Sequence, residues 1–116
     1  MESKASEKTG ETADTSACPV SFGIAGWSYP DWDGYVYPRG TKDKLAYVAP
    51  YVDVVEINST FYRPPDARMV ESWASRTAEW PEFRFTAKLH QDITHAGKLE
   101  PGMVDAFHWG FEPLVR

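Results

Sequence analysis

Three short β-type segments alternate with helical segments from residue 20 onward, and this order constrains the fold more than any other feature of the 116-residue sequence. Short runs of β-branched, aromatic and alternating apolar residues predict the strands. They are residues 20–25 (VSFGIA), 53–58 (DVVEIN) and 83–89 (FRFTAKL). Strands that are separated by helices favour parallel βαβ units with right-handed crossovers.

Helical spacing of apolar residues predicts three helices between and after these strands. Thr41 is predicted to cap the first helix, residues 42–49, which Pro50 ends. The second helix is expected over residues 64–79, and the third begins near Met103. The apolar positions are Val70, Trp73, Ala74 and Trp80 for the second helix, and Val104, Phe107, Phe111 and Leu114 for the third.

The predicted fold class is α/β, as a partial (β/α)8 TIM barrel of about the first three βα units. A complete barrel of this kind has eight units and typically ~250 residues. We therefore expect residues 19–116 to be the N-terminal part of a truncated barrel domain, or a subunit that self-associates through an open sheet edge. Residues 1–18 are polar and contain no aromatic residue, which predicts a disordered tail.

Composition limits the class of protein and its partners. The sequence is 42% hydrophobic and 25% charged, as in soluble globular proteins, and no apolar run approaches the ~20 residues of a membrane helix. A lone cysteine, Cys18, and the lack of a secretory signal predict a cytoplasmic protein without intrachain disulfides. A net charge of −5 gives no electrostatic footprint for nucleic acid, and no Gly-rich loop indicates a nucleotide cofactor, so the cofactor is left undefined.

Alternation along the strands predicts which side chains face the barrel interior. In the third strand the apolar residues belong under the helices, which leaves the polar residues inside. The second strand follows the same rule, so its carboxylate and its amide also face inward. The residues expected under the helices are Val55, Ile57, Phe83, Phe85, Ala87 and Leu89, and those expected inside are Val54, Glu56, Asn58, Arg84, Thr86 and Lys88.

Glu56 and Lys88 are the leading catalytic candidates, because both lie near C-terminal strand ends, where TIM-barrel active sites are built. Glu56 fits a general base or a metal ligand, and Lys88 fits an electrophile for phosphate or carboxylate or a Schiff-base amine. The alternative is a structural ion pair. His95 is the third candidate, as a general acid or base, with a surface histidine as its alternative. His90 and His95 have a spacing that matches no strong zinc pattern, so no metal site is predicted.

A small-molecule substrate is the partner that these residues suggest. Side chains able to hydrogen-bond it follow the second strand, and aromatic residues follow the first strand, where they form either a wall for a sugar or base or a loop packed over the barrel mouth. The predicted substrate-binding residues are Trp27, Ser28, Tyr29, Asn58, Ser59 and Tyr62.

Several of these residues lie in motifs that resemble the YecE-like family, domain of unknown function 72. The motifs are GIAGWSY (23–29), EINSTFY (56–62) and FTAK (85–88) followed by ITH (93–95). The resemblance covers about residues 20–116 and implies a TIM barrel that is longer than this chain, without implying a reaction. It favours a site role for Glu56 and Lys88. Two classes of function stay open: an enzyme for a small polar substrate, carbohydrate-like or phosphorylated, and a non-catalytic remnant or subunit that folds only with a partner.

Overall fold

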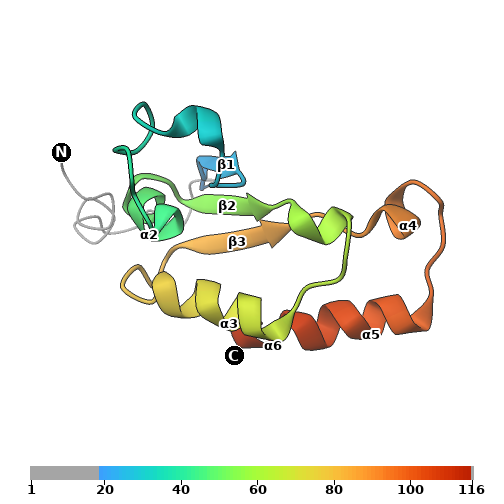
Figure 1. Cartoon of the computed structure of the whole chain (residues 1–116). Coiled ribbons are helices and arrows are strands. Elements are labelled where there is room, and N and C mark those ends of the chain that lie inside the picture. Colours follow the sequence, from blue (N-terminus) through green and yellow to red (C-terminus); the bar gives the residue numbers. More distant parts are fainter. Residues whose placement is uncertain (1–18, 116) are drawn as a thin grey trace.

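The computed structural model describes residues 19–115, which form a mixed α/β structure around a parallel sheet (Figure 1). The predicted tail, residues 1–18 with Cys18, lies outside this range. The strands are β1 (Gly23–Ala25), β2 (Val54–Ile57) and β3 (Arg84–Ala87), in the order β1-β2-β3. Both strand pairs are parallel, so the predicted α/β class and parallel sheet are confirmed.

The strand register aligns the residues that share a face of the sheet. Ala25, Glu56 and Thr86 lie side by side on the three strands. Gly23 is paired with Val54, and a Cβ atom at Gly23 would lie 2.2 Å from the Val54 carbonyl oxygen. Glycine is therefore required where β1 approaches β2 this closely.

Helices follow each strand, and several are single turns. The α-helices α3 and α5 have ten residues each, and none of the helices of residues 19–115 is long and apolar enough to cross a membrane. The α-helices are α2 (Lys44–Val48), α3 (Ala67–Arg76), α4 (Gln91–Thr94), α5 (Pro101–Gly110) and α6 (Glu112–Val115), and the 3₁₀ turns are η1 (Pro30–Trp32), η2 (Ala49–Tyr51) and η3 (Ser59–Phe61).

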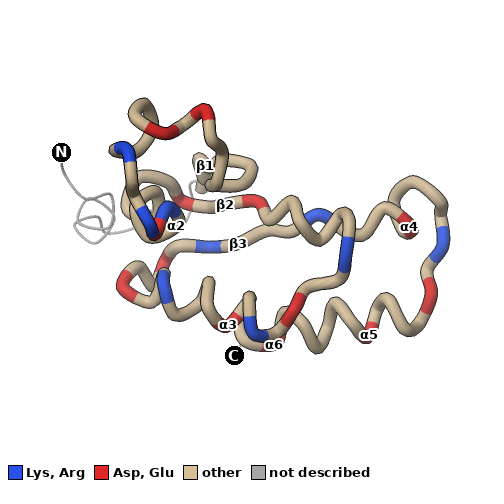
Figure 2. The backbone as a smooth tube through the Cα atoms, in the orientation of Figure 1, with Lys and Arg blue, Asp and Glu red and all other residues tan. Residues whose placement is uncertain are grey.

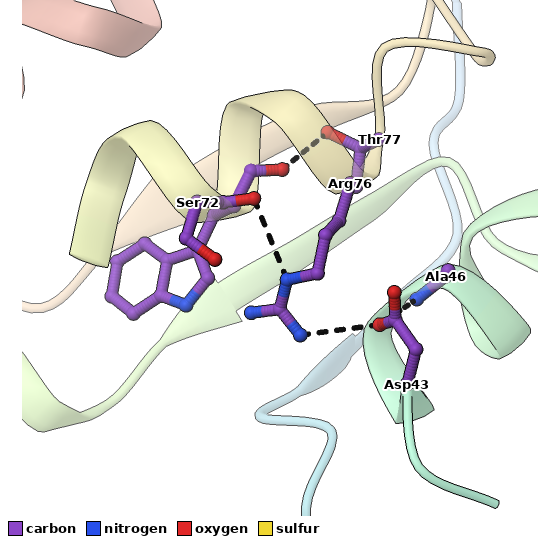
Figure 3. Close-up of polar contacts among 6 residues, drawn as sticks. Asp43, Ala46, Ser72, Arg76 and Thr77 are labelled. Atoms are coloured by element: carbon purple, nitrogen blue, oxygen red, sulfur yellow. Dashed lines mark hydrogen bonds and ion pairs between the residues drawn. The ribbon is translucent and has the colours of Figure 1, made fainter. Parts of the chain in front are cut away.

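Asp43, and not Thr41, caps α2, so that prediction was wrong. The Asp43 carboxylate accepts a hydrogen bond from the Ala46 N–H at 3.1 Å, whereas the Thr41 hydroxyl donates to the Pro38 carbonyl. The same carboxylate lies 3.1 Å from Arg76 Nη1 near the end of α3 (Figure 3). Asp43 therefore joins the two helices as well as capping one of them.

The second and third predicted helices are confirmed as elements, with different bounds. Asp66 caps α3 by accepting from the Arg68 and Met69 N–H groups, so the helix starts after the two prolines. The last helix begins at Pro101 and is split into α5 and α6, and the short α4 before it was not predicted. Val104 was expected on the packed face but is 45% exposed, because α5 turns its Gly110 face toward Pro65 instead.

The core lies on one face of the sheet. Leu45, Ile57, Val70 and Trp73 form its buried centre, so α2 and α3 both cover the face that Ile57 presents. Phe111, between α5 and α6, and Leu114, within α6, pack against the same cluster. Figure 1 shows α3, α5 and α6 together beneath β3. The side chains packed around the centre are Trp27, Phe83, Phe85, Phe111 and Leu114.

The predicted strand phase is largely confirmed. Val55 and Ile57 are buried, and Phe85 packs on the core from the helix-covered face. Ala87 and Leu89 were expected under helices, but both are exposed, with Leu89 at 49%. Ala87 borders a groove rather than a helix. The opposite face of the sheet, which carries Glu56 and Thr86, has no helix packed on it among the described residues; we call it the open face.

Candidate functional site

Glu56 and Lys88 meet on the open face, near the C-terminal ends of β2 and β3. Lys88 Nζ lies 3.5 Å from Glu56 Oε1, and the two side chains are 46% and 41% exposed, respectively. Both side chains therefore lie on the face away from the helices, as the alternation along the strands predicted, but they are half-exposed rather than buried. An ion pair this accessible to water contributes ~0–1 kcal/mol to stability, so its charges remain available to a ligand.

The backbone of Lys88 is fixed from two directions. Its N–H donates to the Ile57 carbonyl at 3.0 Å, and its carbonyl accepts from the Thr60 hydroxyl at 2.6 Å. Thr60 is 1% exposed and lies in η3, the turn that follows β2. Sequence reasoning missed this positioning residue, although it is the central residue of the STF turn within the EINSTFY motif.

A cavity of about 310 Å³ opens beside Lys88 and brings together four of the predicted site residues. His95 contributes one wall: its ring lies edge-on to Phe61 at 5.0 Å, and its Nδ1 is 2.9 Å from the Thr94 hydroxyl. Within residues 19–115 no hydrogen bond reaches the other ring nitrogen, Nε2, which leaves it free for a ligand. The cavity is lined by Asn58, Phe61, Tyr62, Lys88 and His95.

His90 connects the segment that carries Tyr62 with the start of α4, which precedes His95. Its ring is buried, with Nδ1 accepting from the Asp92 N–H at 3.1 Å and Nε2 lying 3.2 Å from the Tyr62 carbonyl. Because Nδ1 acts as an acceptor, Nε2 carries the proton and donates to Tyr62. His90 thereby links α4 to the η3 turn. Across the described part of the chain, no group of three or more His, Cys, Asp or Glu side chains is placed to hold a metal ion.

A second cavity, of about 380 Å³, lies between the ends of β1 and β2 and α3. The Tyr29 hydroxyl donates to the Ala25 carbonyl and accepts from Asn58 Nδ2 at 3.3 Å. Asn58 lines both cavities, and its Oδ1 is buried without a hydrogen-bond partner among residues 19–115. The predicted site residues Trp27, Ser28, Tyr29, Asn58 and Ser59 all line this second cavity.

The aromatic loop after β1 packs mainly on itself and on the core. Trp27 lies edge-on to Trp73 at 5.4 Å, and its carbonyl is 3.2 Å from the hydroxyl of the buried Tyr37. The same hydroxyl accepts from the Tyr29 N–H at 3.2 Å. Tyr37 is a second positioning residue that the sequence reasoning did not single out as such. Trp27 is thus a wall of the second cavity whose ring is already engaged with the core.

Residues 21–116 match the family described as Protein of unknown function DUF72. The chain belongs to the DUF72 family. The UPF0759 protein YunF of Bacillus subtilis (strain 168) is 30% identical over 105 residues, which are 84% of this chain and 36% of that protein. The chain therefore spans about a third of the length of this relative. No solved structure is significantly similar to it.

The DUF72 match includes every residue that lines the two cavities, since these lie between Gly26 and His95. It confirms the resemblance seen in the sequence motifs. The structure divides the predicted site residues of this DUF72 chain, apart from Glu56, between two neighbouring cavities that share Asn58. One gathers charged and ionisable side chains, while the other is mainly aromatic and apolar.

Proposed function

We propose that this DUF72 chain binds a small polar molecule in the cavity beside Lys88, at the C-terminal ends of β2 and β3. The observation that carries the proposal is the convergence of Asn58, Tyr62, Lys88 and His95 on one cavity of about 310 Å³. These side chains follow two neighbouring strands, the η3 turn and α4, and all four are among the site residues predicted from the sequence.

The chemistry of the walls suits a ligand that carries an anionic group or several hydroxyl groups. Lys88 supplies ammonium donors, of which one is directed to Glu56 at 3.5 Å. His95 Nε2 can donate or accept, and Asn58 and Tyr62 add neutral polar groups. In this proposal Lys88 holds the anionic or carbonyl oxygen and His95 exchanges protons with the ligand, while Glu56, which does not line the cavity, acts through its ion pair with Lys88.

We also propose that the sheet is the first part of a (β/α)8 barrel. Its order β1-β2-β3 with parallel pairing, and the packing of α2 and α3 on the same face, support this. A doubly wound sheet would instead carry helices on both faces. In a barrel the open face becomes the interior, and the cavity beside Lys88 lies at the end of the barrel where active sites are found.

A thermal-shift screen of the 116-residue chain tests the binding proposal. The probes are inorganic phosphate, citrate, glucose and a hexose phosphate, and at least one is expected to raise Tm, because ligands stabilise the state that binds them. Lys88→Met and His95→Phe should abolish the shift, while Lys42→Met, which removes an exposed lysine outside the cavity, should keep it. No shift with any probe, or an undiminished shift in both cavity variants, would contradict the proposal.

Among residues 19–115 no strand pairs with the outer edge of β3, which favours a second role as a subunit whose sheet another polypeptide completes. A groove of about 570 Å³ runs beside this edge, lined mainly by apolar side chains of β3, α3 and the C-terminal helices. An uncovered strand edge next to apolar surface is a site of strand pairing. Sedimentation velocity across a range of concentrations tests for such assembly, and a monomer at all concentrations would restrict the role to pairing with a different chain.

A further inference from the structure

The second cavity, of about 380 Å³, lies where the residues that follow β1 and β2 meet α3. β1 and β2 are paired with each other, and β3 lies on the far side of β2. A strand added to either edge of the sheet would lie outside this pair, so it would leave the walls of the cavity in place.

Two tryptophans and a methionine give this cavity its main chemistry. The rings of Trp27 and Trp73 meet at an interplanar angle of 84°, with 5.4 Å between their centroids. Trp27 is partly exposed, and Met69, one turn before Trp73 on α3, is 52% exposed. Indole rings favour edge-on and offset contacts with other aromatic rings, and thioethers also favour aromatic neighbours. These walls therefore favour an aromatic ligand over a saturated one.

The lining of this cavity carries no charge, in contrast with that of the cavity beside Lys88. Figure 2 shows charged positions on β2 and β3, whereas the segment directly after β1 is uncharged. An ionised ligand would lose water there without gaining a partner of opposite charge. Ser28 and Ser59 line the cavity and are exposed, and their hydroxyls form no hydrogen bond with any residue in 19–115. They can therefore bond a hydroxyl or N–H group of a neutral ligand.

The wall that follows β1 is held in place before any ligand binds. The Gly26 N–H donates to the Glu56 carbonyl at 2.9 Å, and the Trp27 carbonyl lies 3.2 Å from the Tyr37 hydroxyl. Tyr37 is 1% exposed, so the contact with its hydroxyl is sheltered from water. A ligand thus meets a surface that is already formed, and the wall loses little conformational entropy on binding.

We infer that the second cavity binds a neutral aromatic molecule, of one ring or two fused rings, that carries a hydroxyl or N–H group. The cavity volume of about 380 Å³ lies within the ~300–1,000 Å³ of ligand pockets. The ring packs against Trp27 and Met69, and its polar group faces the serine hydroxyls. This site is separate from the one proposed beside Lys88, because the two cavities share only Asn58.

Methyl NMR of the 116-residue chain, with ¹³C-labelled methionine methyl groups, tests this inference with phenol and indole as probes. An aromatic ring beside Met69 should shift its methyl signal, whereas Met103 of α5, which does not line the cavity, should keep its signal unchanged. Cyclohexanol has the hydroxyl group of phenol without the aromatic ring and should bind about fivefold more weakly. Inorganic phosphate and glucose, which probe the cavity beside Lys88, should not displace phenol.

Two leucine variants make the test specific. Ser59→Leu places a larger side chain in the cavity and should weaken phenol binding about tenfold or more, whereas Ser72→Leu, at an exposed position of α3 outside the cavity, should leave it unchanged. Equal shifts of Met69 and Met103, equal binding of cyclohexanol and phenol, or undiminished binding by a folded Ser59→Leu variant would overturn the inference. Phosphate bound beside Lys88 with no aromatic probe bound would also overturn it and would leave the proposed function intact. Phenol bound at Met69 with no ligand beside Lys88 would support the inference and contradict the proposed function.

Discussion

Lys88→Met separates a binding role from a structural role for the pair on the open face, because it removes the charge and keeps most of the side-chain length. Lys88 Nζ and Glu56 Oε1 are 3.5 Å apart, and the two side chains are 46% and 41% exposed. Exposed ion pairs contribute ~0.2–1 kcal/mol to the free energy of unfolding, whereas removing one partner of a buried pair lowers it by ~3–5 kcal/mol. The structure therefore predicts that Lys88→Met lowers the free energy of unfolding by less than about 1 kcal/mol.

Urea unfolding followed by tryptophan fluorescence measures this loss. With an m-value of ~1–3 kcal/mol/M, the transition midpoint should fall by less than about 1 M. Glu56→Gln and the double variant complete a cycle whose coupling energy should also stay below about 1 kcal/mol. A loss of about 3 kcal/mol or more from either single variant would refute the reasoning, because it would show that the open face is covered in solution.

Three further predictions concern residues that shape the site and the fold. Thr60→Val should lower the free energy of unfolding by ~1–3 kcal/mol in the same urea assay, because it leaves the Lys88 carbonyl without its donor. Ser59→Ala, at an exposed neighbouring residue, should change it by less than about 0.5 kcal/mol. Gly26→Ala should destabilise the fold by at least ~1 kcal/mol, because Gly26 has φ +73° and a Cβ atom there would lie 2.4 Å from the Tyr29 hydroxyl. Calorimetry measures this loss, and an unchanged Tm would contradict the close contact. Asp43→Ala should lower the free energy of unfolding by ~1–2 kcal/mol, because it removes both the α2 cap and the contact with Arg76. Asp43→Asn should lower it by less, because the amide oxygen can still cap the helix. Equal losses in the two variants would show that the cap does not contribute to stability.

The alternation of β3 made its orientation predictable from sequence. Phe83 and Phe85 are apolar while Arg84 and Thr86 are polar, and a strand turns successive side chains to opposite faces. Consecutive parallel strands are usually neighbours, so the same reasoning placed Glu56 of β2 near the end of β3. The register found in the structure agrees, with Glu56 beside Thr86.

Helix ends were less predictable because they depend on distant residues. Thr41 and Asp43 are both good capping residues, and the choice between them is associated with Arg76, which is 33 residues away in sequence and pairs with Asp43. The four-residue α4 is too short to show helical periodicity, and it is held at its start by the side chain of His90.

The residues that position the site were missed for a similar reason. Thr60 and His90 act through hydrogen bonds to backbone carbonyls 28 residues away, and such bonds leave no periodic signal in the sequence. For the aromatic residues after β1 the sequence left both a substrate wall and a packed loop open; the ring of Trp27 packs on Trp73 of α3, and Trp27 also lines the second cavity. Aromatic residues in a loop do not reveal whether they face a ligand or the core.

The location of ligand contacts on the chain decides whether the cavity beside Lys88 is a binding site. Amide and side-chain chemical shifts of the 116-residue protein can be followed while the best probe of the thermal-shift screen is added. The largest shift changes are expected on Asn58, Tyr62, Lys88 and His95, and Lys88→Met should weaken them while the protein stays folded. Shift changes confined to other parts of the chain, with these four residues unmoved at saturation, would contradict this expectation.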